Sequence, residues 1–272
     1  MVRQVRPITC GVVSTATDYK KIENKIISGI RSYFQNAGYE NAVIGLSGGL
    51  DSTTACLLTA KALGEQNVHG IILPAETTPR NDVEDALLFA RELGINHYIF
   101  NISDIANAFV HRLHHRHLLP NSNVTRGNIA ARARMTALYN VAQRTRSLVV
   151  GTGDRSELLL GYFTKYGDGG ADILPLGSLY KTEVRALAKS MHIPPFILNK
   201  PSSPNLWHGQ TAAEELGADY GQIDPILQML VDKKMNEKSV ARKTKNAQLV
   251  AKISSMIKKS EHKRKTPFIV RA

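Results

Sequence analysis

The chain has 272 residues, and 35 lysines and arginines against 23 aspartates and glutamates give it a formal net charge of +12. This surplus suits a polyanionic partner, but the single tryptophan and the lack of alternating aromatics and arginines count against a nucleic-acid platform, so we expect no nucleic-acid partner. No apolar run is long enough to cross a bilayer and the first residues lack the core of a signal peptide, so we expect a cytoplasmic protein without a membrane partner.

Apolar runs and helical patterns alternate through the first half of the chain. The apolar runs predict buried strands at 42–47, 67–74, 97–102 and 147–151. The helical patterns predict helices at 18–36, 52–64, 80–93 and 127–145. This order predicts a single α/β domain over residues 1–272, with a mostly parallel sheet in a Rossmann-like sandwich, helices on both faces and ligands beyond the carboxyl ends of the strands.

The first predicted strand runs into a glycine-rich turn, Gly-Leu-Ser-Gly-Gly-Leu-Asp-Ser at residues 45–52. Gly48 and Gly49 have no Cβ, so the backbone can come close to phosphate oxygens. The free N–H groups at the start of the following helix add positive potential at the same place. Two hydroxyls and a carboxylate complete the set: Ser47, Ser52 and Asp51. The turn therefore predicts an ATP site.

Two common nucleotide motifs do not fit this turn. It has no lysine where the usual phosphate loop requires one, and it lacks the third glycine of the dinucleotide fingerprint. It resembles instead the SGGxDS loop of enzymes that split ATP into AMP and pyrophosphate to activate a carboxylate or carbonyl oxygen. The alternative is a plain strand-to-helix turn.

The segment from Gly127 to Met135 places an arginine where it could bind an anion. On a helix Asn128 and Arg132 share one face, whereas Arg134 points elsewhere. Arg132 could hold a phosphate or a carboxylate through two parallel hydrogen bonds. The alternative is an exposed arginine on an amphipathic helix.

The segment 151–157, Gly-Thr-Gly-Asp-Arg-Ser-Glu, follows the last predicted strand. Its Glu157 is expected within reach of Asp51, and two carboxylates beside a triphosphate suit Mg²⁺; the alternative is that Glu157 only begins a helix. The glycine-rich run at 163–172 is typical of a binding loop. Candidate ligand contacts in and after it are Lys165 and Lys181 for phosphate, and Asp172 for a polar group of the other substrate.

Together, SGGLDS, GNIAARARM, GTGDRSE, FTKYGDGGADILPLG and the late His262-Lys263-Arg264 resemble the ammonia-dependent NAD synthetase family over nearly the whole chain. The resemblance implies an adenine-nucleotide α-hydrolase-like fold and a homodimer with the dinucleotide site near the subunit interface. The implied reaction joins deamido-NAD and ammonia, with ATP as co-substrate and Mg²⁺ as cofactor, and releases NAD, AMP and pyrophosphate.

The resemblance also implies a role for each matching residue. The implied ATP contacts are Gly45, Leu46, Ser47, Gly48, Gly49, Leu50, Asp51, Ser52, Thr152, Lys181 and Ser203. The implied deamido-NAD contacts are Arg132, Lys165, Asp172, His262 and Lys263, with Tyr33 as an aromatic contact from the neighbouring subunit. Asp51 and Glu157 would hold Mg²⁺, and with Lys181 they form the expected catalytic set.

For two later segments, the residues alone indicate something other than a substrate contact. The basic stretch at 258–272 reads as a solvated tail, so only the resemblance gives His262 and Lys263 a ligand. The segment 200–217, rich in proline and glycine, is predicted to be a mobile cover over the adenylate. It carries Ala212 and Ala213 where the resembling proteins usually have acidic residues.

Two alternative functions fit the residues less well. A tRNA-modifying enzyme of the same loop superfamily suits the charge, but Cys10 and Cys56 offer no catalytic pair, because Cys56 is expected to be a buried free thiol. A non-catalytic adenine-nucleotide-binding protein would not need both Asp51 and Glu157. The chain leaves no room for a glutaminase domain, so free ammonia is the expected nitrogen source; the alternative is a separate glutaminase subunit that supplies it. The histidines between 111 and 117 favour a partly exposed helix-to-loop segment over a metal site; they are His111, His114, His115 and His117.

Overall fold

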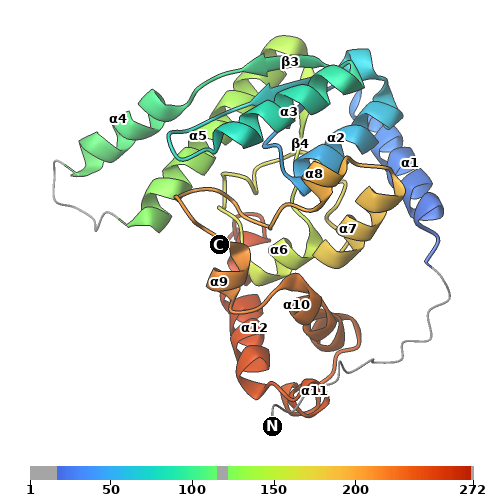
Figure 1. Cartoon of the computed structure of the whole chain (residues 1–272), viewed down its shortest axis with the longest axis vertical. Coiled ribbons are helices and arrows are strands. Elements are labelled where there is room, and N and C mark those ends of the chain that lie inside the picture. Colours follow the sequence, from blue (N-terminus) through green and yellow to red (C-terminus); the bar gives the residue numbers. More distant parts are fainter. Residues whose placement is uncertain (1–16, 115–121, 271–272) are drawn as a thin grey trace, which may run out of the picture.

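A parallel sheet with helices on both faces forms the upper part of the molecule in Figure 1. The computed structural model describes residues 17–114 and 122–270. Within these residues the sheet has four strands in the order β3-β2-β1-β4, all parallel. Their bounds are Asn41–Gly45 for β1, Val68–Ile72 for β2, Asn96–Ile99 for β3 and Ser147–Val150 for β4.

The register of the central strands decides where the loops meet. Ile44 of β1 aligns with Gly70 of β2 on one side and with Val150 of β4 on the other. Parallel strands in this register end at the same edge of the sheet, so the glycine-rich turn after β1 lies beside the loop after β4. The predicted strands are confirmed, with ends that differ by a few residues.

The helices around the sheet are α1 Tyr19–Ala37, α2 Leu50–Leu63, α3 Arg80–Leu93, α4 Ser103–His114 and α5 Asn123–Thr145. The four predicted helices are confirmed, and α4 is additional. Helix α2 begins at Leu50 instead of residue 52, because Gly49 takes the extended conformation of an N-cap. Asp51 consequently lies in the first turn of α2.

Two apolar layers cover the two faces of the sheet. One layer contains Phe34 of α1, Leu58 of α2 and Phe89 of α3. The other contains Ala130 and Ala142 of α5, packed against strand residues. The α/β fold class with helices on both faces is therefore confirmed.

Beyond β4 the structure adds helices that the sequence patterns did not predict. They are α6 Arg155–Leu160, α7 Lys181–Ser190, α8 Pro195–Leu198, α9 Ala212–Leu216, α10 Tyr220–Leu227, α11 Glu237–Thr244 and α12 Ala247–Lys259. Helices α6 and α9–α12 enclose a core of their own around Leu160, Ile223 and Ile253. Helices α9–α12 form the lower part of the molecule in Figure 1. The single-domain organisation stays a prediction.

A buried carboxylate joins these helices to the sheet edge. Asp224 of α10 accepts hydrogen bonds from the Ser156 hydroxyl at 2.6 Å and from the Thr182 backbone N–H at 2.9 Å. The Ser156 hydroxyl oxygen in turn accepts the Lys181 backbone N–H at 3.0 Å. Because Asp224 binds the first turns of both α6 and α7, it fixes the positions of Glu157 and Lys181.

Other expectations concern single residues and the membrane. Cys56 is fully buried as a free thiol, as predicted, and burial raises its pKa to about 12. Cys10, His115 and His117 lie outside the described residues. Among the described helices, none combines the length and the apolar character that a bilayer span requires.

Candidate active site

Hydrogen bonds of the Ser47 and Ser52 hydroxyls hold the glycine-rich turn in its conformation. The Ser47 and Ser52 hydroxyl oxygens lie 3.0 Å apart, and the Gly49 N–H donates to the Ser47 hydroxyl at 3.3 Å. Gly48 has a φ of 73°, a left-handed conformation that glycine adopts at little cost. Ser47 is exposed, so the turn opens to solvent as a phosphate cradle requires.

The three residues predicted as the catalytic set meet at one point. The Lys181 ammonium lies 2.6 Å from the Asp51 carboxylate and 2.8 Å from the Glu157 carboxylate. Its side chain is 3% exposed, so its ammonium is available only to these neighbouring carboxylates. Asp51 and Glu157 converge as expected, and the Lys181 ammonium lies between them.

A third carboxylate, Asp154, belongs to the same cluster. It is fully buried and lies 2.9 Å from the Lys181 ammonium. It also caps α6, because its side chain accepts the Glu157 N–H at 2.8 Å while the Glu157 side chain accepts the Asp154 N–H at 3.2 Å. We did not select Asp154 from the sequence, although the Asp-x-x-Glu spacing before an apolar run signals such a cap.

The charges of this cluster are unbalanced. Burial alone would lower the pKa of Lys181, but the carboxylates of Asp51, Glu157 and Asp154 outweigh it and hold that pKa well above its usual value. Burial raises the pKa of Glu157 and of Asp154, and the Lys181 ammonium offsets this only in part. Three carboxylates share one ammonium, so full ionisation of all three would leave an excess of negative charge, and their mutual repulsion adds to the raised pKa values of Glu157 and Asp154.

This excess and one orphaned atom fit a divalent cation. The Asp51 Oδ1 atom is buried and has no hydrogen-bond partner among the described residues. No group of three or more His, Cys, Asp or Glu side chains in residues 17–114 and 122–270 has the arrangement of a complete metal site. Mg²⁺ commonly takes one or two carboxylates together with substrate phosphates, so the donors present are suitable for it.

The loop after β4 is fixed to the sheet by Asp172. Its carboxylate accepts the Val149 N–H at 2.7 Å and the Tyr139 hydroxyl at 3.1 Å. Burial and the charge of Asp172 raise the pKa of Tyr139 to about 12, with a further contribution from nearby Tyr33.

Thr152 lies half-buried just beyond β4, on the same edge as Asp51. Tyr33 is on α1 and is partly exposed, near Tyr139 of its own chain.

The C-terminal segment returns to the loop after α6. The Lys165 ammonium donates to the His262 carbonyl at 2.8 Å, and the Lys263 ammonium donates to the Gly161 and Phe163 carbonyls at 2.7 Å each. Arg264 donates to the Leu158 carbonyl at 2.9 Å. The solvated-tail interpretation is therefore wrong for Lys263 and Arg264. Arg264 thus binds a carbonyl in the last turns of α6, and Lys263 binds carbonyls of the residues that follow this helix.

Arg132 lies beside this returning segment. Asn128, one turn earlier on α5, accepts the Thr164 hydroxyl at 2.6 Å, which joins α5 to the same loop. Burial lowers the pKa of Lys263, and the nearby Arg132 guanidinium lowers it further. Arg132 is exposed, whereas Arg134 turns away and donates to the Leu73 carbonyl at 3.0 Å. The structure thus gathers the residues assigned to deamido-NAD on the β4 side of the edge, except Tyr33 on α1.

The predicted cover lies across the other side of this edge. Ser203 uses its hydroxyl within the cover, donating to the Gln210 carbonyl at 2.5 Å and accepting the Asn205 N–H at 3.1 Å. Ala212 is buried in the C-terminal core, which explains a small apolar residue there, and Ala213 is exposed. Whether the cover moves stays a prediction.

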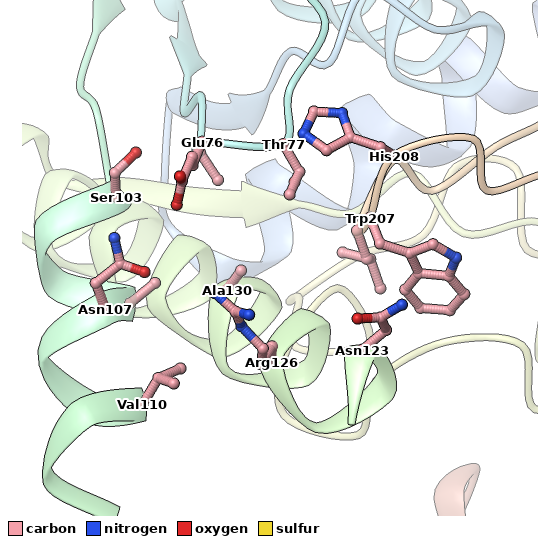
Figure 2. A pocket seen from close by; sticks show the side chains of 13 residues that line it. Glu76, Thr77, Ser103, Asn107, Val110, Asn123, Arg126, Ala130, Trp207 and His208 are labelled. Carbon is pink, nitrogen blue, oxygen red and sulfur yellow. The ribbon is translucent and has the colours of Figure 1, made fainter. Parts of the chain in front are cut away.

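A cavity of about 370 Å³ lies beneath the cover. Figure 2 shows its walls: α4, the first turns of α5, the loop after β2, and Trp207 and His208 of the cover. The Thr77 hydroxyl donates to the Asn205 carbonyl at 3.1 Å, which fastens the cover to the loop after β2. This cavity was not predicted, because its walls come from four separate segments.

The whole pattern matches known proteins. A family model described as NAD synthase matches residues 22–267. The chain belongs to the NAD synthase family. Among the relatives of this NAD synthase chain, the NH₃-dependent NAD⁺ synthetase of Staphylothermus marinus is 46% identical over 257 residues, covering 92% of this chain and 91% of the relative. That of Pyrobaculum aerophilum is 45% identical over 255 residues, covering 94% of each chain.

Solved structures agree with this membership. The NMN synthetase of Francisella tularensis superposes with a TM-score of 0.82 at 35% identity, covering 94% of this chain and 99% of that chain. The NH₃-dependent NAD synthetase of Campylobacter jejuni, solved with a nitrate ion, gives a TM-score of 0.78 at 32% identity, covering 94% and 100%. The chain is thus an enzyme of the NAD synthase family, with the adenine-nucleotide α-hydrolase-like fold that the sequence indicated.

Proposed function

We propose that this enzyme amidates deamido-NAD with free ammonia, using ATP, and releases NAD, AMP and pyrophosphate. The observation that carries the proposal is the meeting of Asp51, Glu157 and Lys181 beside an open glycine-rich turn. This arrangement supports the proposal, because the Lys181 ammonium and the two carboxylates would then lie beside the triphosphate. The family membership favours this reaction over the tRNA-modifying alternative.

The chemistry needs activation of a carboxylate. Ammonia does not displace oxide from a carboxylate, so the nicotinate oxygen first attacks the α-phosphorus of ATP and pyrophosphate leaves. Ammonia then attacks the acyl carbon of this mixed anhydride, and AMP leaves with one of the original carboxylate oxygens. The backbone N–H groups of the turn would hold the phosphates, and Lys181 would stabilise the charge on departing pyrophosphate. Asp51 and Glu157 would hold Mg²⁺, which supplies further neutralisation of the triphosphate when bound.

The second substrate would lie on the β4 side of the edge. The cations of Arg132, Lys165 and Lys263, together with the His262 imidazole, would suit the diphosphate of deamido-NAD. Asp172 and Tyr33 lie at the side of this group near Tyr139. Because Lys263 already donates to two carbonyls, its contribution would be to shape the site as much as to bind the ligand.

One solved structure favours a second acceptor. NMN synthetase from Francisella tularensis covers nearly the same chain at 35% identity. The acid that corresponds to NMN is nicotinate mononucleotide, which shares the reacting carboxylate with deamido-NAD but lacks the adenylate half. We prefer deamido-NAD, because the relatives from Staphylothermus marinus and Pyrobaculum aerophilum, at 46% and 45% identity, are named NH₃-dependent NAD⁺ synthetases.

One assay tests the reaction and the acceptor together. The enzyme is incubated with ATP, Mg²⁺, ammonium and either deamido-NAD or nicotinate mononucleotide, and AMP and the amide product are followed in the same samples. We expect equal amounts of AMP and NAD, with deamido-NAD the better acceptor. AMP without an amide, or a preference for the mononucleotide, would contradict the assignment.

We also propose a homodimer in the cytoplasm. The resemblance implies a subunit interface beside the dinucleotide site, and Tyr33 of α1, which is 40% exposed, is the aromatic side chain that would reach the neighbouring subunit. Sedimentation of the purified enzyme at micromolar concentration tests this, and a monomer would contradict it. Fractionation of cells that produce the protein tests the compartment.

The cavity beneath the cover is the proposed place for the adenosine of ATP. Residues of the loop after β2, from Ala75 to Thr77, line this cavity. The proposed deamido-NAD contacts lie instead on the β4 side of the sheet edge. Trp207→Ala should raise the KM for ATP about tenfold, the scale of one lost stacking contact, and Trp207→Phe should restore most of it. Because Trp207 is the sole tryptophan, ATP should also change the intrinsic fluorescence of the wild type. A fluorescence response to deamido-NAD alone would contradict this placement.

A further inference from the structure

The first residue of the cover contacts the glycine-rich turn directly. The Lys200 ammonium donates to the Gly48 carbonyl at 2.9 Å. It also lies 2.6 Å from the Asp82 carboxylate and 2.5 Å from the Asp85 carboxylate, both in the first turns of α3. Lys200 was not selected from the sequence, and neither the reaction nor the family resemblance assigns it a role.

Asp82 of α3 also packs against Gly48 and binds the cover. Its second carboxylate oxygen accepts the Asn205 side-chain amide at 2.7 Å. Its backbone carbonyl occupies the space that a Cβ on Gly48 would need. Lys200, Asp82 and Asn205 therefore enclose Gly48 between the cover and α3, and we call these four residues the Gly48 clamp.

The clamp fixes the direction of a backbone donor. In a planar trans peptide the carbonyl and the following N–H point in opposite directions. When Lys200 holds the Gly48 carbonyl, the Gly49 N–H must face the opposite side, where it meets the Ser47 hydroxyl at 3.3 Å. That side carries the exposed hydroxyl of the proposed phosphate cradle.

The charge of Lys200 is already balanced by its neighbours. A lysine beside a phosphate loop would ordinarily be taken for a phosphate ligand, but here two carboxylates lie within 2.6 Å of its ammonium. We propose that Lys200 is a positioning residue of the ATP site, which fixes the Gly48–Gly49 peptide so that the Gly49 N–H and the Ser47 hydroxyl that it contacts lie on the phosphate side, and which connects the cover to the turn. This inference rests on the proposed use of ATP.

Binding measurements without deamido-NAD or ammonia isolate this role. Lys200→Met should weaken the binding of ATP and of pyrophosphate about tenfold, the scale of one charged hydrogen bond, and leave adenosine binding unchanged. In turnover the KM for ATP should rise by a similar factor while kcat changes less than threefold, and Lys200→Arg should recover part of the loss. Lys189→Met, an exposed lysine at the end of α7, is the control. Unchanged pyrophosphate affinity in folded Lys200→Met would overturn the proposal.

Asp82→Asn separates positioning from direct contact with phosphate. If Lys200 acts through the Gly48 clamp, this variant should also weaken ATP binding, by about threefold to tenfold. If Lys200 were a phosphate ligand, loss of its counter-charge would strengthen ATP binding, and that result would overturn the proposal. Wild-type enzyme that fails to bind ATP would overturn both this inference and the proposed function, whereas an effect missing only in the variants overturns this inference alone.

Discussion

Replacement of Lys181 by methionine should damage both stability and turnover. The side chain is almost fully buried, and its ammonium is shared by the carboxylates of Asp51, Asp154 and Glu157. Removing one partner from a buried charge cluster typically costs about 3–5 kcal/mol, because the remaining charges lose their compensation. Loss of a cation that stabilises developing charge should lower kcat by about 10²–10³-fold.

Urea unfolding and steady-state kinetics measure the two effects of Lys181→Met separately. Lys189→Met, which removes an exposed lysine from the same helix, should change neither. Added Mg²⁺ should recover part of the lost stability, because a divalent cation can take over the excess negative charge, but it should not recover kcat. A variant as stable and as active as the wild type would show that the cluster is incidental.

Asp51→Ala and Glu157→Ala should each abolish turnover while leaving the fold intact. Each variant leaves Lys181 with two carboxylates, so the buried ammonium keeps its compensation. Each also removes one of the two donors proposed for Mg²⁺, which the triphosphate needs for neutralisation. Turnover at saturating ATP, together with the thermal unfolding midpoint, measures both consequences.

Matched amides sharpen this test. Asp51→Asn and Glu157→Gln keep the size of each side chain, and Glu157→Gln can still cap Asp154 through its carbonyl oxygen. We expect both to be as inactive as the alanine variants, because the charge is what binds the cation. Near-normal activity in any of the four variants would refute the metal assignment.

Sequence patterns predicted the parts of the structure that depend on neighbouring residues. The apolar run at Ala42–Ile44 followed by residues 45–52 predicted a strand, a turn and a helix, and β1 and α2 have those places. Parallel strands end at one edge, so Asp51 and Glu157 were expected to converge, and both reach the Lys181 ammonium.

The rest of the site depends on contacts between distant parts of the chain. Lys181 and Asp51 are 130 residues apart, and Lys200 and Gly48 are 152 residues apart. No periodicity indicates such pairs, so the sequence placed Lys181 against phosphate and could not show its carboxylate partners. Lys200 escaped notice for the same reason.

The basic C-terminal segment shows how composition can mislead. A run of lysines and arginines suggests solvation, yet Lys263 and Arg264 donate to backbone carbonyls at the end of α6. Helix α6 is short, and the two cations join its last turns and the loop that follows to the C-terminal segment. A helix that the sequence patterns did not predict could not reveal that its end binds these cations.

The most direct test of the proposed chemistry follows an oxygen atom. Deamido-NAD labelled with ¹⁸O in its nicotinate carboxylate is converted with ATP and ammonia, and the label is located by mass spectrometry. Attack of the carboxylate on the α-phosphorus predicts one ¹⁸O atom in AMP, one in the amide of NAD and none in pyrophosphate. Label in pyrophosphate, or AMP formed without label, would contradict an adenylated carboxylate as the intermediate.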